Sequence, residues 1–284
     1  MGIVRTTGDL GVSGELPANQ ELLDWLAVEF REGGWDVKKF VKLMLMSATY
    51  RQSAAVTPLK LEKDPANRLM SRGPRFRMDA EVVRDNALAV SGLLVAKIGG
   101  PSVRPYQPDG VWESIAMIGS TTQRYTRDSG DNLYRRSLYT FIKRMAPPAS
   151  LDIFNSPNRE SCSVRRERTN TPMQALVTMN DEQHVEAARR FAEHILKHGG
   201  SADDQRLQFA AHQLLSRDLQ ADELAILNDS LAQLAAFYKD HAKEAGELIQ
   251  IGESEPDASF DTGTLAAWTM LCNEMMNLDE VLNK

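Results

Sequence analysis

The chain has 284 residues, of which 42% are hydrophobic and 25% charged, a composition typical of a soluble globular protein with a substantial core. Its formal net charge of −6 argues against a nucleic-acid binder, because nucleic-acid-binding domains usually carry a basic excess. No apolar run approaches the roughly 18 residues that a membrane span needs, and the first residues show no signal-peptide pattern. The only two cysteines, Cys162 and Cys272, give neither a disulfide framework nor a CxxCH haem-attachment motif.

Apolar residues at three-and-four spacing predict two helices near the start of the chain. Residues 19–32 carry one apolar stripe and end at Gly33-Gly34, a natural stop signal. Residues 36–52 begin at an aspartate suited to cap a helix and continue the same spacing. The two segments together predict a helical hairpin. The polar, proline-containing stretch 57–74 is predicted to be a loop.

The middle of the chain alternates between a helical pattern and an irregular one. Residues 75–98 predict a helix that closes on Gly99-Gly100, and its second half is apolar nearly all round, which predicts burial. Residues 99–131 contain prolines and repeated Gly, Ser and Thr, so they predict a long irregular segment that crosses the surface. Residues 132–148 fit both strand alternation and helical spacing, and helix is favoured.

From Thr171 onward the pattern is almost entirely helical. After a first helix at 172–179, further helices are predicted over 185–195, about 203–216, 224–238 and 267–282. The stripe at 224–238 covers two heptads, short of a coiled coil, so we predict that it packs inside the domain. The fold class is therefore mainly α: a single helical domain over 1–284 with a long irregular segment, at most a minor hairpin, and 146–170 as the place where a sub-boundary would fall.

An arginine-rich stretch precedes the helix predicted at 172. Arg165 and Arg168 lie just ahead of the sequence TPMQ, which fits a T-x-x-Q capping box with proline at the first helical position. A helix N-terminus with two arginines, next to Asn170, is a candidate anion-binding pocket. The alternative is that the arginines pair with the chain's own carboxylates. We favour this structural interpretation, because arginine is the usual partner of buried carboxylates.

The carboxylates in question stand on the helix predicted at 75–98. That segment carries Arg77, Asp79, Glu81, Arg84 and Asp85. Glu81 and Asp85 are four residues apart, a spacing that lets two carboxylates share a metal ion or a proton. The flanking cations favour ion pairs instead, so the sequence predicts an arginine–carboxylate network without a metal. We expect no cofactor: neither haem nor a tightly held transition metal has a ligand cluster in the sequence.

Several unusual motifs carry a resemblance to a known family. Among them are SATYRQS, NRLMSRGPRFRMDAEVVRDNALAVSGLL, GGPSVRPYQPDGVWE, LYRRSLYTFIKR and VRRERTNTPMQALVTMND. On these motifs the chain resembles the planctomycete PSD1 family, domain of unknown function 1553, over nearly its whole length. The resemblance implies the C-terminal domain of a large exported protein that also contains a cytochrome-c-like domain. Because the first matching residues correspond to a point inside the family's domain, we expect an N-terminally truncated copy.

The resemblance carries no established activity, so three functions stay open. The leading hypothesis is a non-catalytic structural or binding module of a larger exported cell-envelope protein, with an anionic polysaccharide as a candidate partner. A second is a polysaccharide-active enzyme in which Asp79, Glu81 or Asp85 acts as acid or base. A third is a docking surface for a cytochrome-c-like domain. No GxSxG, P-loop or GxGxxG motif supports a hydrolase or nucleotide-binding template. An extracytoplasmic location is implied by the resemblance alone.

Overall fold

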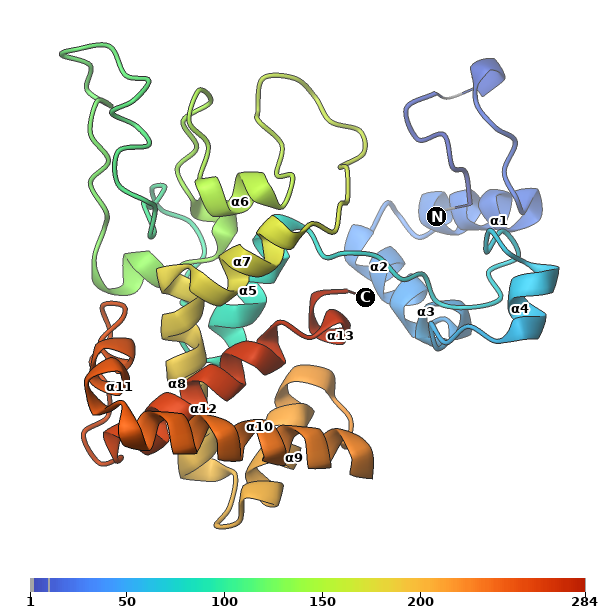
Figure 1. The fold of residues 1–284 in the computed structure, drawn as a ribbon. Coiled ribbons are helices and arrows are strands. Elements are labelled where there is room, and N and C mark those ends of the chain that lie inside the picture. The colour runs from blue at the N-terminus through green and yellow to red at the C-terminus, as the bar shows by residue number, and fades with distance from the viewer. Residues whose placement is uncertain (1–2, 10, 284) are drawn as a thin grey trace. The chain divides into compact units, whose positions relative to one another are not determined.

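The computed structural model describes residues 3–9 and 11–283, and their contacts form two compact units. The first unit contains the described residues up to 76 together with 162–166, and the second contains 77–161 and 167–283. Both are built from helices (Figure 1), and the β-structure of the described residues consists of four isolated bridges. The predicted mainly α fold is confirmed. The extent of the domain stays a prediction.

The first unit is a short helical array. It contains the 3-10 helix η1 (Gly11–Ser13) and the α-helices α1 (Gln20–Glu32), α2 (Val37–Met46), α3 (Ala48–Arg51) and α4 (Pro58–Lys63). The side chains of Asn19 and Asp36 cap α1 and α2 by accepting hydrogen bonds from backbone N–H groups three residues on. The predicted helix at 36–52 is interrupted at Ser47, whose extended backbone ends α2 and whose hydroxyl caps α3.

The prediction of a loop over 57–74 was wrong in its first part, where α4 forms. Thr57 caps this helix by accepting a hydrogen bond from the Lys60 N–H, and Pro58 occupies the first helical position. Proline is tolerated there because its missing N–H would have no intrahelical partner.

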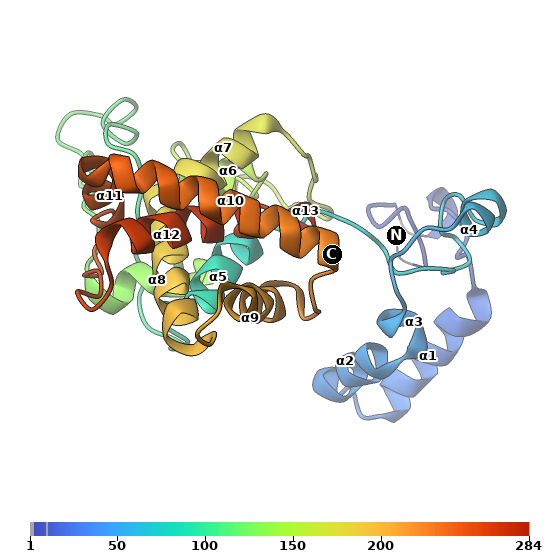
Figure 2. The same cartoon turned by 60° about the horizontal axis from the view of Figure 1, so that its bottom comes forward.

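The second unit contains the remaining helices. They are α5 (Ala80–Val90), η2 (Gly130–Tyr134), η3 (Ser137–Tyr139), α6 (Ala149–Ile153), α7 (Pro172–Asn180), α8 (Glu182–His198), α9 (Asp203–Leu215), α10 (Ala221–Asp240), α11 (Ala242–Ile249), α12 (Thr262–Met276) and α13 (Asp279–Leu282). Helix α12 packs across α8, and α10 and α11 pack against α12 (Figures 1 and 2). None of the helices within 3–9 and 11–283 is both long and apolar enough to cross a membrane.

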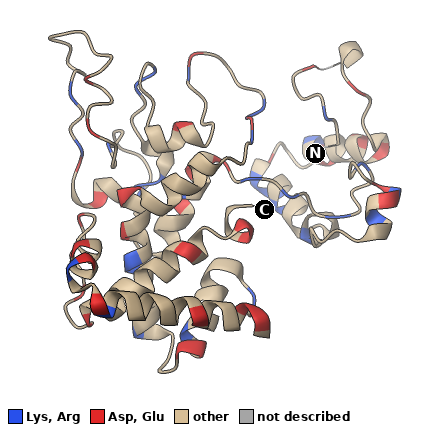
Figure 3. Cartoon of the chain, in the orientation of Figure 1, with Lys and Arg blue, Asp and Glu red and all other residues tan. Residues whose placement is uncertain are grey.

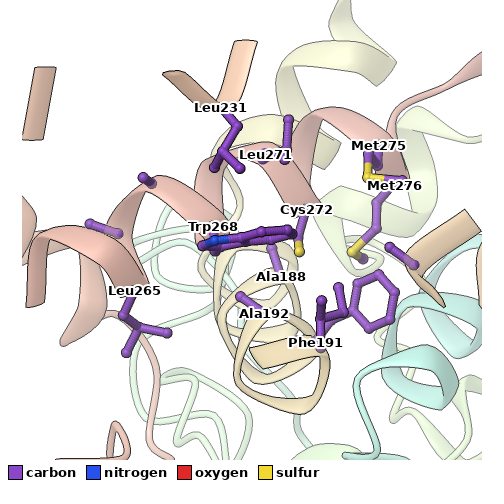
Figure 4. Close-up of a cluster of buried hydrophobic side chains, with 14 of the residues drawn as sticks. Ala188, Phe191, Ala192, Leu231, Leu265, Trp268, Leu271, Cys272, Met275 and Met276 are labelled. Atoms are coloured by element: carbon purple, nitrogen blue, oxygen red, sulfur yellow. The ribbon is translucent and has the colours of Figure 1, made fainter. Parts of the chain in front are cut away.

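The main core of the second unit lies where α12 crosses α8. Trp268 and Cys272 of α12 face Ala188 and Phe191 of α8 (Figure 4), and all four are buried. Alanines on both helices allow close approach, while the larger side chains fill the space between them. The stripe predicted at 224–238 packs into this core from α10, as expected for a helix that packs inside its own domain.

Three sequence predictions in this unit need correction. The helix predicted to reach residue 98 ends at Val90, because the Ser91 hydroxyl bonds the Leu88 carbonyl and Gly92 turns the backbone at a φ of +74°. The predicted helix over 132–148 is wrong: two 3-10 turns and isolated bridges occupy most of it. The last predicted helix is broken at 277–278. The irregular course of 99–131 is confirmed up to Gly130, where η2 begins.

Candidate functional site

Four of the predicted site residues gather just before α7. Arg168 Nη2 lies 3.4 Å from Asp79 Oδ1, and the two side chains are 42% and 32% exposed. Arg77 Nη2 donates a hydrogen bond to Asn170 Oδ1. Burial lowers the pKa of the Arg77 guanidinium. The cluster is a partly exposed set of side chains at the surface of the second unit.

The N-terminus of α7 carries the predicted capping box. The Gln174 N–H donates to the Thr171 carbonyl at 3.1 Å, and the Gln174 side chain accepts from the Thr171 N–H at 3.3 Å. These bonds occupy two of the backbone donors that an anion at this helix end would use. Arg165 is exposed and belongs to the first compact unit, whereas the other predicted residues belong to the second.

Arg84 and Asp85 have a different environment from the cluster before α7. Arg84 is buried, and it donates to Gln183 Oε1 at 2.6 Å and to the Leu133 and Arg135 carbonyls at 2.8 Å each. Burial lowers its pKa to about 10, opposed by the nearby Asp85 charge. Asp85 Oδ1 accepts from both the backbone N–H and the hydroxyl of Ser137, at 2.7 Å each. These two side chains fasten α5 to η2 and η3.

Glu81 is a partly buried residue of α5, where it lies one turn before Asp85. Among residues 3–9 and 11–283, no three His, Cys, Asp or Glu side chains are grouped as metal ligands would be.

The Arg168–Asp79 pair gives a first testable prediction. Because both side chains are partly exposed and the contact is long, the coupling free energy between them is expected to be about 0.2–1 kcal/mol, as for other solvent-exposed ion pairs. A double-mutant cycle of Arg168→Ala and Asp79→Ala, followed by urea denaturation, measures this quantity and removes the effect of other contacts of each residue. A coupling of about 3 kcal/mol or more would show instead that the pair behaves as a buried one.

Sequence reasoning missed a buried carboxylate on α8. Glu186 has no solvent exposure, and its two oxygens accept hydrogen bonds from Tyr106 Oη at 2.9 Å, Tyr134 Oη at 2.8 Å and the Ser254 N–H at 2.7 Å. Burial, reinforced by the Glu186 carboxylate, raises the pKa of both tyrosines. The only signal in the sequence was a glutamate between apolar residues on a strongly helical segment. Its partners lie 52 to 80 residues away, which no local pattern can reveal.

An apolar groove lies on the first unit. It has a volume of about 590 Å³ and lies among α1, α2, α3 and the segment 67–74. Its apolar lining includes Trp25, Met44, Met46, Tyr50 and Met70. A smaller hollow of about 270 Å³, between α1 and α2, shares Leu43 and Met46 with it. We refer to the larger hollow as the α1–α3 groove.

Local structure explains the shape of the α1–α3 groove. The break at Ser47 turns the chain from α2 into α3, which places Tyr50 at the groove after Met46. On the opposite side, the Gln52 side chain donates to the Met70 carbonyl at 2.8 Å, which fixes the segment that carries Met70. Met70 itself has a φ of +53°, a conformation that is uncommon for a residue with a long side chain. Such backbone is often found at binding sites.

The first unit buries remarkably little apolar surface for a folded helical array. Within its described residues only Asp64, Arg72 and Gly73 are buried, and no apolar side chain is. Trp25 is 50% exposed and Tyr50 is 63% exposed, although both lie on helices with good caps. Contiguous apolar surface of this kind marks a binding surface more often than an ordinary solvent-facing one. Sequence reasoning missed this because helical spacing alone cannot say whether an apolar face is covered.

The fold and the groove define a mainly helical protein in which the second unit is well packed and the first unit does not cover its own apolar face. Residues 1–231 match the model of the PSD1 family, described as a protein of unknown function (DUF1553). The chain therefore belongs to the PSD1 family. Comparisons with curated proteins and with solved structures found no match.

Proposed function

We propose that this chain is a non-catalytic binding module, and that the α1–α3 groove of its first unit is the surface that docks a partner protein. The observation that carries the proposal is the absence of any buried apolar side chain among the described residues of that unit. Burial of apolar surface is the dominant favourable term in folding and in most protein association. A partner seated in the groove would supply the burial that the unit does not supply itself.

The lining of the groove fits this role. Methionine is flexible and polarisable and adapts to different partners, and tryptophan and tyrosine contribute strongly to protein interfaces. The groove contains all three residue types. The setting that we propose, a larger exported cell-envelope protein, rests on the family resemblance alone.

The enzyme alternative has less support. Asp85 accepts two hydrogen bonds from Ser137, and Asp79 pairs with Arg168, so both carboxylates have structural partners. A general acid or base needs an open path to substrate and a partner that tunes its proton affinity. An anionic polymer is the second candidate partner, since Arg165 and the Arg168 cluster lie at the surface. A cytochrome-c-like domain is one example of a protein that could dock in the α1–α3 groove.

A binding experiment on the full chain tests the proposed function. A stapled helical peptide of about 18 residues, with leucine and tryptophan along one face and uncharged polar residues elsewhere, imitates a docking helix. We expect saturable binding by fluorescence anisotropy. Met46→Glu, which places a charge at the groove, should weaken the affinity by about tenfold or more, because a desolvated charge opposes apolar contact.

A matched variant controls for the general effect of the substitution. Met117 is an exposed methionine of the second unit, so Met117→Glu makes the same chemical change away from the groove and should leave the affinity unchanged. Equal losses in the two variants, or no binding by the parent chain, would contradict the proposal. Saturable binding of dextran sulfate that depends on Arg165, with no peptide binding, would favour the anionic-polymer function instead.

A further inference from the structure

We infer that the partner held in the α1–α3 groove is an amphipathic helix whose polar face is acidic. This inference rests on the proposed docking function and goes further by stating the chemistry of the occupant. Two observations carry it: the distribution of charge beside the groove, and the way in which the polar side chains of the groove are already used.

The segment that carries α2 and α3 contains only basic charges, and two of its lysines, Lys39 and Lys42, line the smaller hollow that adjoins the groove. Residues 37–61 contain Lys38, Lys39, Lys42, Arg51 and Lys60 and no aspartate or glutamate. The cations of α2 can be followed in Figure 3. No ion pair joins any of these five to a carboxylate among residues 3–9 and 11–283. This positive excess is a local property of the chain. Residues 3–76 contain eleven Lys and Arg and nine Asp and Glu, whereas the whole chain has a net charge of −6.

Cations and apolar side chains alternate around α2. Val37, Val41 and Leu45 form an exposed apolar strip of this helix outside the lining of the groove, and Lys38 and Lys42 lie beside it at helical spacing. A partner that covers the apolar strip must bring its own polar residues close to these lysines. Complementary charge at such a rim speeds association and excludes partners of the wrong sign.

The polar side chains of the groove leave few free groups for recognising a small ligand. The Ser47 hydroxyl contacts the Met44 carbonyl and the Tyr50 N–H, and the Asn67 side chain bonds the Arg72 backbone. Arg72 Nη1 donates to the Asp64 carbonyl at 2.8 Å. Small-molecule sites usually present converging polar groups that fix the ligand's orientation. These groups instead hold the walls of the groove, which suits an apolar ridge such as a row of helical side chains.

The same surface is less suited to a lipid bilayer. The groove is concave, and its α1 wall is formed by Leu22, Trp25 and Leu26. The flat surface of a bilayer would not fill a concave groove of this kind. An amphipathic helix, in contrast, can place its apolar residues in the groove and its acidic residues close to the cations of α2 and α3.

Three peptides test the charge of the occupant on the full chain. Each has about 18 residues, and the first two have the same apolar stripe. One has glutamate at the flanking positions, one has lysine there, and one has the glutamate composition in an order without a stripe. We expect the glutamate peptide to bind about tenfold or more tightly than the lysine peptide, and the scrambled peptide to show no saturable binding. Raising the salt from about 0.1 M to about 1 M shortens the screening length from about 10 Å to about 3 Å and should reduce this difference.

Charge reversal at the rim gives the decisive comparison. The double variant Lys42→Glu, Arg51→Glu should reverse the preference between the glutamate and lysine peptides, while Lys243→Glu on α11 should leave it unchanged. Equal affinity for both peptides would contradict the inference that the partner is acidic but would not contradict the proposed docking function. Absence of binding by every striped peptide, the uncharged one included, would overturn both. Sedimentation with phosphatidylserine vesicles, or a dimer whose formation Met46→Glu prevents, would assign the groove to a membrane or to a second copy and would also overturn the inference.

Discussion

Replacing Arg84 with alanine should destabilise the second unit by about 3–5 kcal/mol, the cost typical of removing one member of a buried charged network. Arg84 is 4% exposed and donates to two backbone carbonyls and the Gln183 side chain. Without the guanidinium these acceptors stay buried and unpaired, and the turn at η2 and η3 loses its attachment to α5. The urea midpoint, followed by far-ultraviolet circular dichroism, should fall accordingly.

The neighbouring turn offers a control for this variant. Arg136 lies in the same turn but is exposed, so Arg136→Ala should change the free energy of unfolding by less than about 1 kcal/mol. A similar midpoint for the two variants would show that the Arg84 bonds contribute far less than their burial indicates. Arg84→Lys should recover only part of the loss, since an ammonium group cannot reproduce the planar fork of donors.

Gly252→Ala should also be strongly destabilising, by about 3 kcal/mol or more, because two costs act together. Gly252 has a φ of +95°, which favours glycine, and an added Cβ would lie 2.4 Å from Glu186 Cδ. The carboxylate would have to leave its position between Tyr106 and Tyr134. The loss of these charge-assisted bonds inside the protein adds to the backbone strain.

Gly246→Ala is the matched control and should raise, rather than lower, the free energy of unfolding. Gly246 lies inside α11, and nothing stands within 4 Å of an added Cβ. Alanine is favoured over glycine in a helix interior by about 1 kcal/mol, so this variant should be slightly more stable than the parent. Equal urea midpoints for Gly252→Ala and the parent chain would show that Glu186 can move at little cost.

Local signals in the sequence account for much of the helical structure. Apolar spacing predicted the helices, and the two caps identified in the sequence, Asp36 and Thr171, each mark a helix start that the structure contains. The missed helix α4 follows the same rule, since Thr57-Pro58 repeats the signal of Thr171-Pro172. The wrong helix over 132–148 has a different cause. There the Leu133 and Arg135 carbonyls bond Arg84, some fifty residues earlier in the chain, and this tertiary contact prevails over helical spacing.

The candidate site was less accessible to sequence reasoning than the fold. Composition pointed to Arg168 as a partner for Asp79, and the two lie 3.4 Å apart. The partners of Arg84 and Asp85 could not be identified, because Arg84 donates to backbone carbonyls and Asp85 accepts from Ser137, which no residue pattern marks. The α1–α3 groove was missed for a related reason. The stripes of α1 and α2 predict helices that bury one face, and only the three-dimensional structure shows that these faces remain open.

The polar bonds around α8 have a consequence for how the second unit folds. Glu186 is joined to residues 52 to 80 positions away along the chain, and Arg84 bonds Gln183 across 99 positions. Closing the long loops between such distant residues costs conformational entropy, so we expect these contacts to form after the folding transition state. Interactions absent from the transition state act mainly by slowing unfolding. The buried network is therefore expected to slow the unfolding of the second unit more than it changes the rate of folding.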